Sequence, residues 1–305
     1  MSSHPQVLLL GNGINRTYGG TSWTDLMKDI NVRKDFDPEK LEAPMPMQAI
    51  LLTNNNLKDA MKNQSKVFRG EIKTKEQGDA LRRLLTMGFD DILTTNYSYE
   101  LESAALGTNQ VKDNELKRIL LRTQKVELRY LLHTCYALEC ETVQNRIWHI
   151  HGESRIPDSM ILGHYWYGNM LGRIKEELKT SGNRFLYRQT HNLPIEYNSW
   201  VDSFILGDVY VLGFGFDLAE LDLWWLLNRK AREKAEKGRV VFYEIKSEKE
   251  GWREKTALLK LFGACVRSLD FHEPNKDDPN KDSIYKQFYE AAISDISKEI
   301  NSRRS

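Results

Sequence analysis

The sequence predicts an α/β fold in which helices cover both faces of a doubly wound parallel sheet. Short segments that are apolar throughout recur along the chain, and segments with helical spacing lie between them. Several of the apolar segments end in Gly, Asn or His, where a helix-like pattern begins. Uniformly apolar strands are typical of parallel sheets buried on both faces, and their alternation with helices indicates βαβ units. We therefore expect a Rossmann-like sheet.

The individual elements follow from this pattern. Strands are expected at Val7–Leu10, Asp91–Thr95, Ile147–Ile150, Val209–Leu212, Arg239–Ile245 and Ala264–Leu269. Helices are expected at Thr24–Ile30, Lys75–Met87, Tyr97–Ala105 and Glu220–Ala235. Because each helix lies between two strands, the strands are expected to be parallel neighbours.

Two segments interrupt the alternation and are expected to form helical insertions beside the sheet. The first covers about residues 106–146, because Asp113–Cys140 has apolar residues near helical spacing: Leu116, Ile119, Leu120 and Leu128. The second covers residues 163–206, which are rich in Tyr, Arg and Asn and contain no strand pattern. A polar linker at residues 274–279 precedes a last amphipathic helix at 281–301. The whole chain, 1–305, is expected to form a single domain.

Composition argues against several classes of protein. The chain has 305 residues, of which 40% are hydrophobic, enough for the core of one large α/β domain. Its 44 basic and 43 acidic residues nearly cancel, so an affinity for nucleic acid based on a basic face is not expected.

Cysteine usage and hydropathy indicate the cellular compartment in which the protein is expected. Three cysteines without a C-x-x-C pair, namely Cys135, Cys140 and Cys265, indicate neither a disulfide framework nor a zinc ribbon. The N-terminus does not resemble a signal peptide, and the longest apolar runs are far shorter than a membrane span. A cytoplasmic protein without a membrane segment is expected.

Ligands of open α/β sheets bind at the carboxyl ends of the strands, so the residues at those ends are candidate site residues. Gly11, Asn12, Gly13 and Asn15 follow the first strand. Glycines at this place permit a tight turn and a close approach of backbone N–H groups to a diphosphate. Arg16 stands where the G-x-G-x-x-G fingerprint has its third glycine, so an ordinary glycine turn is the alternative.

Thr95 and Asn96 end the second strand, and a histidine follows the third. The Asn96 side chain either caps the helix that follows or faces the crevice. His149 and His151 lie on one face if their strand continues, but no third metal ligand accompanies them. We interpret His149 as structural. His151, at the strand end before a glycine, is a candidate base near neutral pH.

The fourth and fifth strands also end in polar residues. Gly213, Gly215 and Asp217 lie in the Gly-Phe-Gly-Phe-Asp segment after the fourth strand. Asp217 and Glu220 have the spacing of a capping box, so both acids alternatively cap a helix. Glu244, near the end of the fifth strand, either accepts hydrogen bonds from ribose hydroxyls or is a solvated charge.

Taken in order, these segments resemble the sirtuin-like family. The loop at residues 11–15 resembles the family's Gly-Ala-Gly-Ile-Ser. Tyr18–Trp23 resembles the Gly-Leu-Pro-Ser-Trp of its bacterial branch, and Thr94–Tyr97 the Thr-Thr-Asn-Tyr-Asp element. His151 and Gly152 match the catalytic His-Gly, and the segment at residues 213–217 is similar to Gly-x-Ser on the adenosine side. The matched segments extend from residue 7 to about residue 245.

The resemblance implies an enzyme that uses NAD as its substrate. It assigns catalytic roles to Asn96 and His151. It assigns NAD binding to Gly11, Asn12, Gly13, Asn15, Thr95, Gly213, Gly215, Asp217 and Glu244. The family's zinc-binding cysteines are absent, so neither zinc nor deacylation is expected. Ser98 stands in place of the family's Asp, a departure that concerns only a supporting role. Zinc-free bacterial members are associated with NAD hydrolysis in anti-phage abortive infection, which the resemblance implies here.

The implied reaction releases nicotinamide and ADP-ribose. Nicotinamide leaves as a neutral molecule and needs no general acid, so the enzyme must stabilise an oxocarbenium-like ribose and activate a nucleophile. Asn96 suits contact with a ribose hydroxyl or the attacking water, and His151 suits the base. Two alternatives are a sensor or structural subunit that binds NAD or ADP-ribose without turnover and, less favoured, a protein deacylase.

An enzyme that destroys NAD freely would kill its host, so we expect its activity to be controlled. The segment after Pro274 is too short for a ligand-sensing domain. We therefore expect a homo-oligomer, a separately encoded regulatory or sensor protein such as an ATPase or a nucleic-acid-sensing protein, or both. Lys281–Asn301 and Gly163–Leu206 are the candidate contact surfaces.

Overall fold

The computed structural model contains one eight-stranded sheet. It describes residues 4–64, 70–112, 114–121, 131–140, 143–249, 251–275 and 277–304. The described strands are β1 Gln6–Leu10, β2 Asp91–Thr94, β3 Arg118–Leu120, β4 Thr134–Cys140, β5 Val143–His149, β6 Asp208–Leu212, β7 Val240–Tyr243 and β8 Ala264–Arg267. Their order across the sheet is β3-β4-β5-β2-β1-β6-β7-β8.

The parallel part of this sheet confirms the predicted fold class. From β5 to β8 all neighbouring strands are parallel, and these six strands coincide with the six predicted ones. After β1 and β2 the chain forms β3 at the edge of the sheet, returns through β4 to β5 beside β2, and then crosses to the other side of β1 to form β6. The strand order therefore reverses between β1 and β6, which is the switch point of a doubly wound, Rossmann-like sheet.

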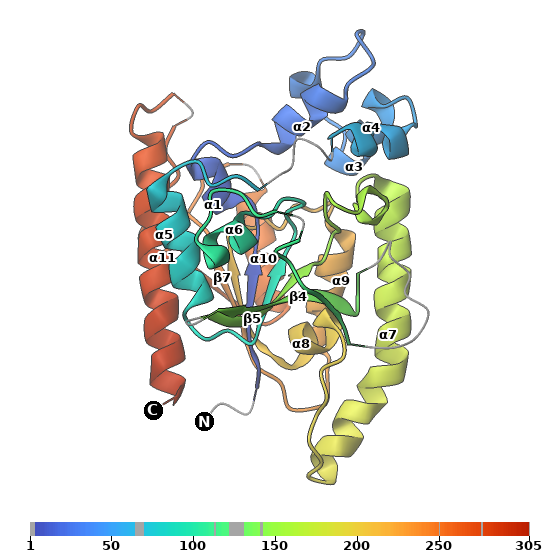
Figure 1. Cartoon of the computed structure of the whole chain (residues 1–305), viewed down its shortest axis with the longest axis vertical. Coiled ribbons are helices and arrows are strands. Elements are labelled where there is room, and N and C mark those ends of the chain that lie inside the picture. The colour runs from blue at the N-terminus through green and yellow to red at the C-terminus, as the bar shows by residue number, and fades with distance from the viewer. Residues whose placement is uncertain are drawn as a thin grey trace.

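Helices cover both faces of the sheet (Figure 1). The described helices are α1 Gly13–Thr17, α2 Trp23–Ile30, α3 Met45–Leu52, α4 Leu57–Gln64, α5 Lys75–Leu85, α6 Glu100–Leu106, α7 His164–Thr190, α8 Trp200–Leu206, α9 Leu221–Ala231, α10 Trp252–Leu261 and α11 Lys281–Arg304. The contacting helices α5 and α11 lie on one side of the sheet, and the contacting helices α7 and α9 lie on the other.

Alternate residues of each central strand enter opposite cores, which explains why the strands are apolar throughout. In β1, Val7 and Leu9 pack in the core under α7, α8 and α9. Leu8 and Leu10 pack in the core under α5, α6 and α11. All four are 0–1% exposed, and burying each such side chain contributes roughly 1.5–3 kcal/mol.

The prediction of a helical insertion at about residues 106–146 is wrong in the described residues. After α6 the chain forms β3 and β4, and β4 pairs antiparallel with β5. In β4, Cys135 enters one core and Leu138 the other, so pairing along the edge of the sheet decides the conformation of this segment. Leu128, one of the residues with helical spacing, lies outside the described residues.

The other two helical predictions are confirmed. Residues 163–206 form α7 and α8, and the predicted last helix is α11. The apolar stripe of α11, which includes Phe288, Ile293 and Ile296, is buried in the core beside α5. Because this stripe is covered by the chain itself, α11 does not present it as the contact surface that the sequence suggested.

Helices α2, α3 and α4 form a small layer of their own at one end of the molecule (Figure 1). Their buried residues, among them Leu26, Met27 and Leu52, pack together with Tyr97 and Met160. The predicted helix at residues 24–30 is confirmed as α2. Because Tyr97 follows β2, this layer is packed against the carboxyl end of the sheet.

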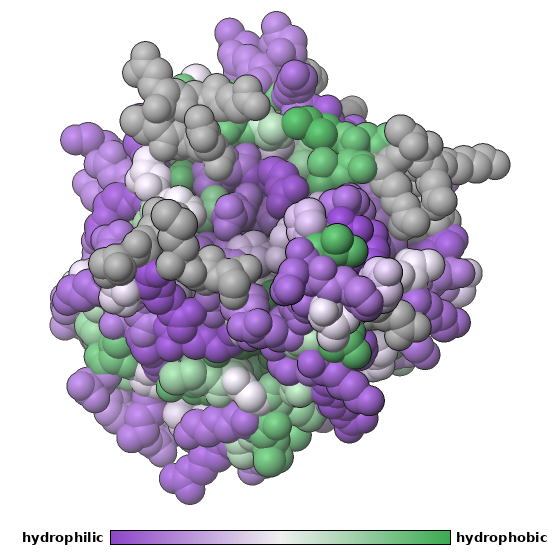
Figure 2. Space-filling model, turned by 90° about the horizontal axis from the view of Figure 1, so that it is seen from below, coloured by the Kyte–Doolittle hydropathy of each residue, from purple (hydrophilic) through white to green (hydrophobic). Residues whose placement is uncertain are grey.

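Among the described helices, none is both long and apolar enough to cross a membrane. On the face seen in Figure 2 hydrophilic side chains predominate, and hydrophobic side chains form separate patches.

Candidate functional site

A cavity of about 950 Å³ lies at the carboxyl end of the sheet. It is lined by residues that follow β1, β2, β6 and β7, the strands on both sides of the switch point. Trp23 and Leu26 of α2 contribute another wall. Its volume is at the upper end of the roughly 300–1,000 Å³ of small-molecule and cofactor sites, and its place is where open α/β sheets bind ligands.

The structure brings most of the predicted site residues to this cavity. Its wall includes Asn12, Gly13, Thr95, Asn96, Gly213, Gly215, Asp217 and Glu244. Gly11, Asn15 and His151 are not on the wall and lie in the layer behind it, where each is buried. Their contacts show what they do there.

The glycines after β1 join two loops across the switch point. The Gly11 N–H donates to the Leu212 carbonyl at 3.0 Å, and the Gly13 N–H donates to the Gly213 carbonyl at 2.8 Å. A Cβ atom on Gly11 would lie 2.4 Å from the Gly213 oxygen. These two N–H groups therefore have backbone partners, and the predicted contact of the loop with a diphosphate stays a prediction.

Asn15 also has a structural partner. Its Oδ1 accepts a hydrogen bond from Gln77 Nε2 at 3.1 Å, and its side chain is buried between α1 and α5. The contact ties α1 to the helix that covers this face of the sheet. The Asn15 side chain therefore binds Gln77 in the interior of the protein.

The segment after β6 does not form the capping box that the spacing allowed. Helix α9 begins at Leu221, and the side chain of its N-cap residue, Glu220, makes no capping hydrogen bond. Asp217 instead accepts a hydrogen bond from the Ala219 N–H at 2.8 Å within the loop. Both acids line the cavity. The Glu220 side chain is therefore not used as a helix cap, and Glu220 is part of the cavity wall.

Asn96 is not a helix cap either, because α6 begins at Glu100 with Tyr99 as its N-cap. The Asn96 N–H donates to Thr94 Oγ1 at 3.1 Å, and its carbonyl oxygen lies 2.8 Å from His149 Nδ1. Its side chain lines the cavity, and no residue in the described ranges hydrogen-bonds the side-chain amide. The backbone of Asn96 is fixed while its amide faces the cavity.

His149 has the structural role that we interpreted for it. It is 2% exposed, and its Nε2 lies 2.9 Å from Glu102 Oε1 on α6. Burial lowers the pKa of His149, but the Glu102 carboxylate, with Glu153 and the Asn96 carbonyl, outweighs burial and raises it to about 9. At neutral pH both ring nitrogens therefore donate hydrogen bonds, one of them to the Asn96 backbone.

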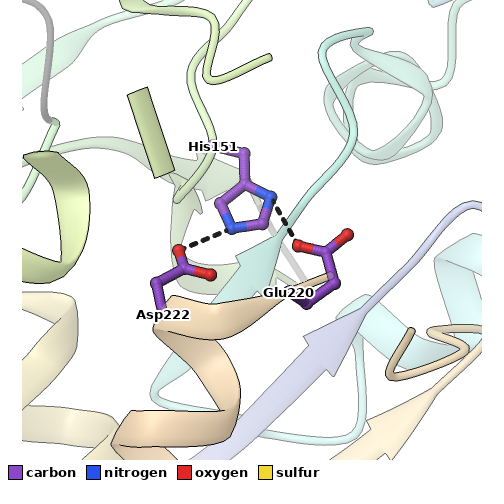
Figure 3. A group of neighbouring side chains, drawn as sticks. All are labelled: His151, Glu220 and Asp222. Atoms are coloured by element: carbon purple, nitrogen blue, oxygen red, sulfur yellow. Dashed lines mark hydrogen bonds and ion pairs between the residues drawn. The ribbon is translucent and has the colours of Figure 1, made fainter. Parts of the chain in front are cut away.

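His151 points away from His149, because β5 ends at His149 and the alternation of a strand does not continue. The ring of His151 lies between two carboxylates (Figure 3). Its Nε2 is 3.0 Å from Asp222 Oδ2, and its Nδ1 is 3.8 Å from Glu220 Oε2. Burial lowers the pKa of His151, and Asp222 followed by Glu220 raises it above the ordinary value.

The sequence pattern assigns no acid to His151. Of Glu220 and Asp222, it singles out only Glu220, as an alternative helix cap together with Asp217. One ligand atom of each of His151, Glu220 and Asp222 lies within 4.8 Å of the others, a spacing compatible with a metal ion. However, each ring nitrogen faces a different carboxylate, and an imidazole offers one nitrogen to a single metal ion. The arrangement as it stands is a hydrogen bond between His151 and Asp222 and a longer ion-pair contact between His151 and Glu220.

Charges on the cavity wall come mostly in pairs. Glu244, the predicted ribose contact, forms an ion pair with Lys255, which also donates to the Gly215 carbonyl at 3.0 Å. Lys73 and Lys249 pair with Glu71 and Glu273. Among the described cations of the wall, Arg16 is the one that forms no ion pair, and it is exposed. Arg16 is therefore the cation available to an anionic ligand.

The fold and the cavity define the class of protein: an α/β protein with a ligand cavity at the switch point of a Rossmann-like sheet. No protein-family model matches the chain, and no curated protein matches it.

Proposed function

We propose that this chain is an NAD hydrolase that cleaves the nicotinamide–ribose bond and releases nicotinamide and ADP-ribose. The observation that carries the proposal is the set of residues on the wall of the switch-point cavity. Its wall combines the Asn96 amide, which no described residue engages, with Glu220, behind which lies the His151–Asp222 pair. An amide and a supported acid–base group are the two parts that ribosyl transfer to water requires.

The wall also offers groups suited to the remainder of a dinucleotide. Arg16 supplies a positive charge that forms no ion pair with a described carboxylate, and the diphosphate of NAD carries negative charge. Glu244 offers a carboxylate to ribose hydroxyls, and Lys255 holds that carboxylate beside the Gly215 loop. A cavity of about 950 Å³ gives space for both ends of the ligand.

The order of the motifs supports a sirtuin-like enzyme of the zinc-free bacterial kind. The segments that carry the resemblance meet around one cavity although they are far apart in the sequence. The proposed biological role, NAD depletion in anti-phage defence in the cytoplasm, rests on that resemblance. The same resemblance without zinc-binding cysteines favours hydrolysis over deacylation.

The test is turnover of NAD by the purified chain. We expect stoichiometric release of nicotinamide and ADP-ribose, measured by chromatography. In Asn96→Ala the release should fall by at least about 100-fold, the scale of one lost transition-state contact, while ADP-ribose binding and the unfolding temperature stay near wild type. If ADP-ribose binds but NAD stays intact at every protein concentration, the chain is a non-catalytic sensor or subunit and the proposal is wrong.

A further inference from the structure

We propose that Glu220 is the catalytic base of this site, and that His151 and Asp222 are positioning residues that hold it. The inference rests on the proposed NAD hydrolysis and names the group that receives the proton of the attacking water. It differs from the sequence-based expectation, in which His151 itself was the base.

Access to the cavity separates Glu220 from His151. Glu220 lines the cavity, and its side chain is 11% exposed. The His151 side chain is 2% exposed, is absent from the wall, and packs edge-on against the Tyr167 ring. A general base must come within roughly 2.6–3.2 Å of the proton it removes, directly or through one water. Of the three residues in Figure 3, Glu220 meets that condition from the cavity side and Asp222 is fully buried.

Contacts behind Glu220 fix the other two residues. Asp222 Oδ1 accepts a hydrogen bond from the Leu223 N–H at 2.9 Å, and its Oδ2 lies 3.0 Å from His151 Nε2. Both carboxylate oxygens of Asp222 are therefore engaged, and the imidazole is held with Nδ1 toward Glu220. This is the arrangement expected of residues that orient a base and stabilise its charge.

The groups around Glu220 keep it close to the protonation range that a base needs. Burial raises its pKa above the ordinary value, and the attraction of His151 opposes that rise. Asp222 and Asp217, from α9 and the loop before it, raise the pKa further, and Tyr167 of α7 lowers it. Tyr97, in the loop after β2, is the remaining titratable neighbour, since its own pKa is raised by burial and by Glu220.

The proposed step balances without any further reactant. The oxygen of a water molecule forms a bond to the anomeric carbon of the nicotinamide ribose, while the bond from that carbon to the ring nitrogen breaks. The bonding pair stays on the nitrogen, so nicotinamide leaves neutral. One water proton passes to the Glu220 carboxylate and then to solvent through the cavity. The sum is NAD⁺ and water giving ADP-ribose, nicotinamide and a proton.

The experiment compares Glu220→Gln and His151→Gln in the full chain across pH. For Glu220→Gln we expect kcat to fall about 100- to 10,000-fold with little change in KM, and the rise of kcat with pH to disappear. For His151→Gln we expect a smaller loss, with the rise retained but shifted, because the base remains while its support is lost. Glu254→Gln, at an exposed carboxylate of α10 outside the cavity wall, is the matched control and should turn over like wild type.

Folding and binding are measured for every variant by thermal unfolding and by ADP-ribose titration. If Glu220→Gln does not fold, Glu220→Asp replaces it, and it should keep a pH-dependent but slower reaction. Near wild-type turnover in Glu220→Gln, with activity abolished in His151→Gln, would overturn the assignment and leave the hydrolase intact. A metal ion that is lost in Glu220→Gln and restores chelated enzyme would also overturn it. Absence of nicotinamide release in the wild type would instead refute the hydrolase, and the assignment with it.

Discussion

At the scale of single residues, two histidines separated by one position contact carboxylates on opposite faces of the sheet. His149 contacts Glu102 on α6, and His151 contacts Asp222 on α9, helices that cover opposite faces of the sheet. The first holds the backbone of Asn96, and the second supports Glu220. Ion pairs of this kind are costly to bury unless hydrogen bonds compensate, so their position is set by the fold rather than by the side chains alone.

Stability should depend on pH through His149. Its pKa of about 9 in the folded chain is above the ordinary 6.5, so the stabilisation is complete below pH 6.5 and is lost as the pH rises through 9. A pKa shift of this size corresponds to roughly 3 kcal/mol in the free energy of unfolding. Urea unfolding at several pH values should show the decline in wild type, and His149→Gln should lack it. An equal decline in both proteins would show that other groups cause it.

The His151 cluster should hold no metal ion in the working enzyme. Each ring nitrogen of His151 is directed at a different carboxylate, so a bound ion would have to break one of these contacts. We expect elemental analysis of purified protein to find well under one zinc per chain, and a chelator to leave NAD turnover unchanged. About one tightly held ion per chain, removed together with activity, would contradict this and reopen the deacylase and metallohydrolase alternatives.

At the scale of elements, the loops after β1 and β6 act as one unit. Two backbone hydrogen bonds join them, and glycine at position 11 allows the loops to approach that closely. Helix α9 begins after the β6 loop and carries Glu220 and Asp222 toward His151. The spacing of these loops therefore sets the geometry of the candidate acid–base group.

Substitution of Gly11 should test this coupling. Gly11→Ala places a methyl group 2.4 Å from the Gly213 oxygen, so we expect a loss of about 1–3 kcal/mol in the free energy of unfolding. Gly215→Ala is the matched control, because no atom outside its immediate neighbours lies within 4 Å of the added carbon. Its unfolding free energy should change by less than about 0.5 kcal/mol. Equal stability of the two variants would show that the loops separate easily.

At the scale of the whole molecule, the chain closes its own cores and leaves α7 with exposed apolar side chains. The stripe of α11 is buried, whereas Tyr165, Leu186 and Tyr187 on α7 are 67%, 40% and 56% exposed. Between the two surfaces that the sequence suggested for contacts, α7 is thus the one that keeps apolar residues in solvent. The expectation that self-assembly or a separately encoded partner contacts this segment stays a prediction.

Control by assembly predicts that activity depends on concentration. Ordering of the site by a neighbouring copy would raise turnover per chain as protein concentration increases, and light scattering would show the accompanying increase in mass. Tyr187→Glu should shift both curves to higher concentration, while Lys234→Ala, at an exposed position in the loop between α9 and β7, should shift neither. Full turnover by a monomer, independent of concentration, is the contrary result.

The sequence by itself determined the parallel sheet and the place of the cavity. Strands buried on both faces must be apolar throughout, as in Val7–Leu10 and Val209–Leu212, and polar residues at their carboxyl ends necessarily meet at one edge. For this reason the sequence alone predicts that Asn12, Asn96 and Glu244 lie at one cavity.

Only the tertiary structure decided which side chains face that cavity and which support it. Local spacing suggested a helix where β3 and β4 form, because pairing with β5 supplies hydrogen bonds that no local pattern reveals. It likewise suggested caps at Asn96 and Glu220, because the start of a helix depends on packing as well as on the capping residue. The contacts of His151 join residues 69 and 71 positions apart in the sequence. Such contacts exist only once the two halves of the sheet have closed on each other.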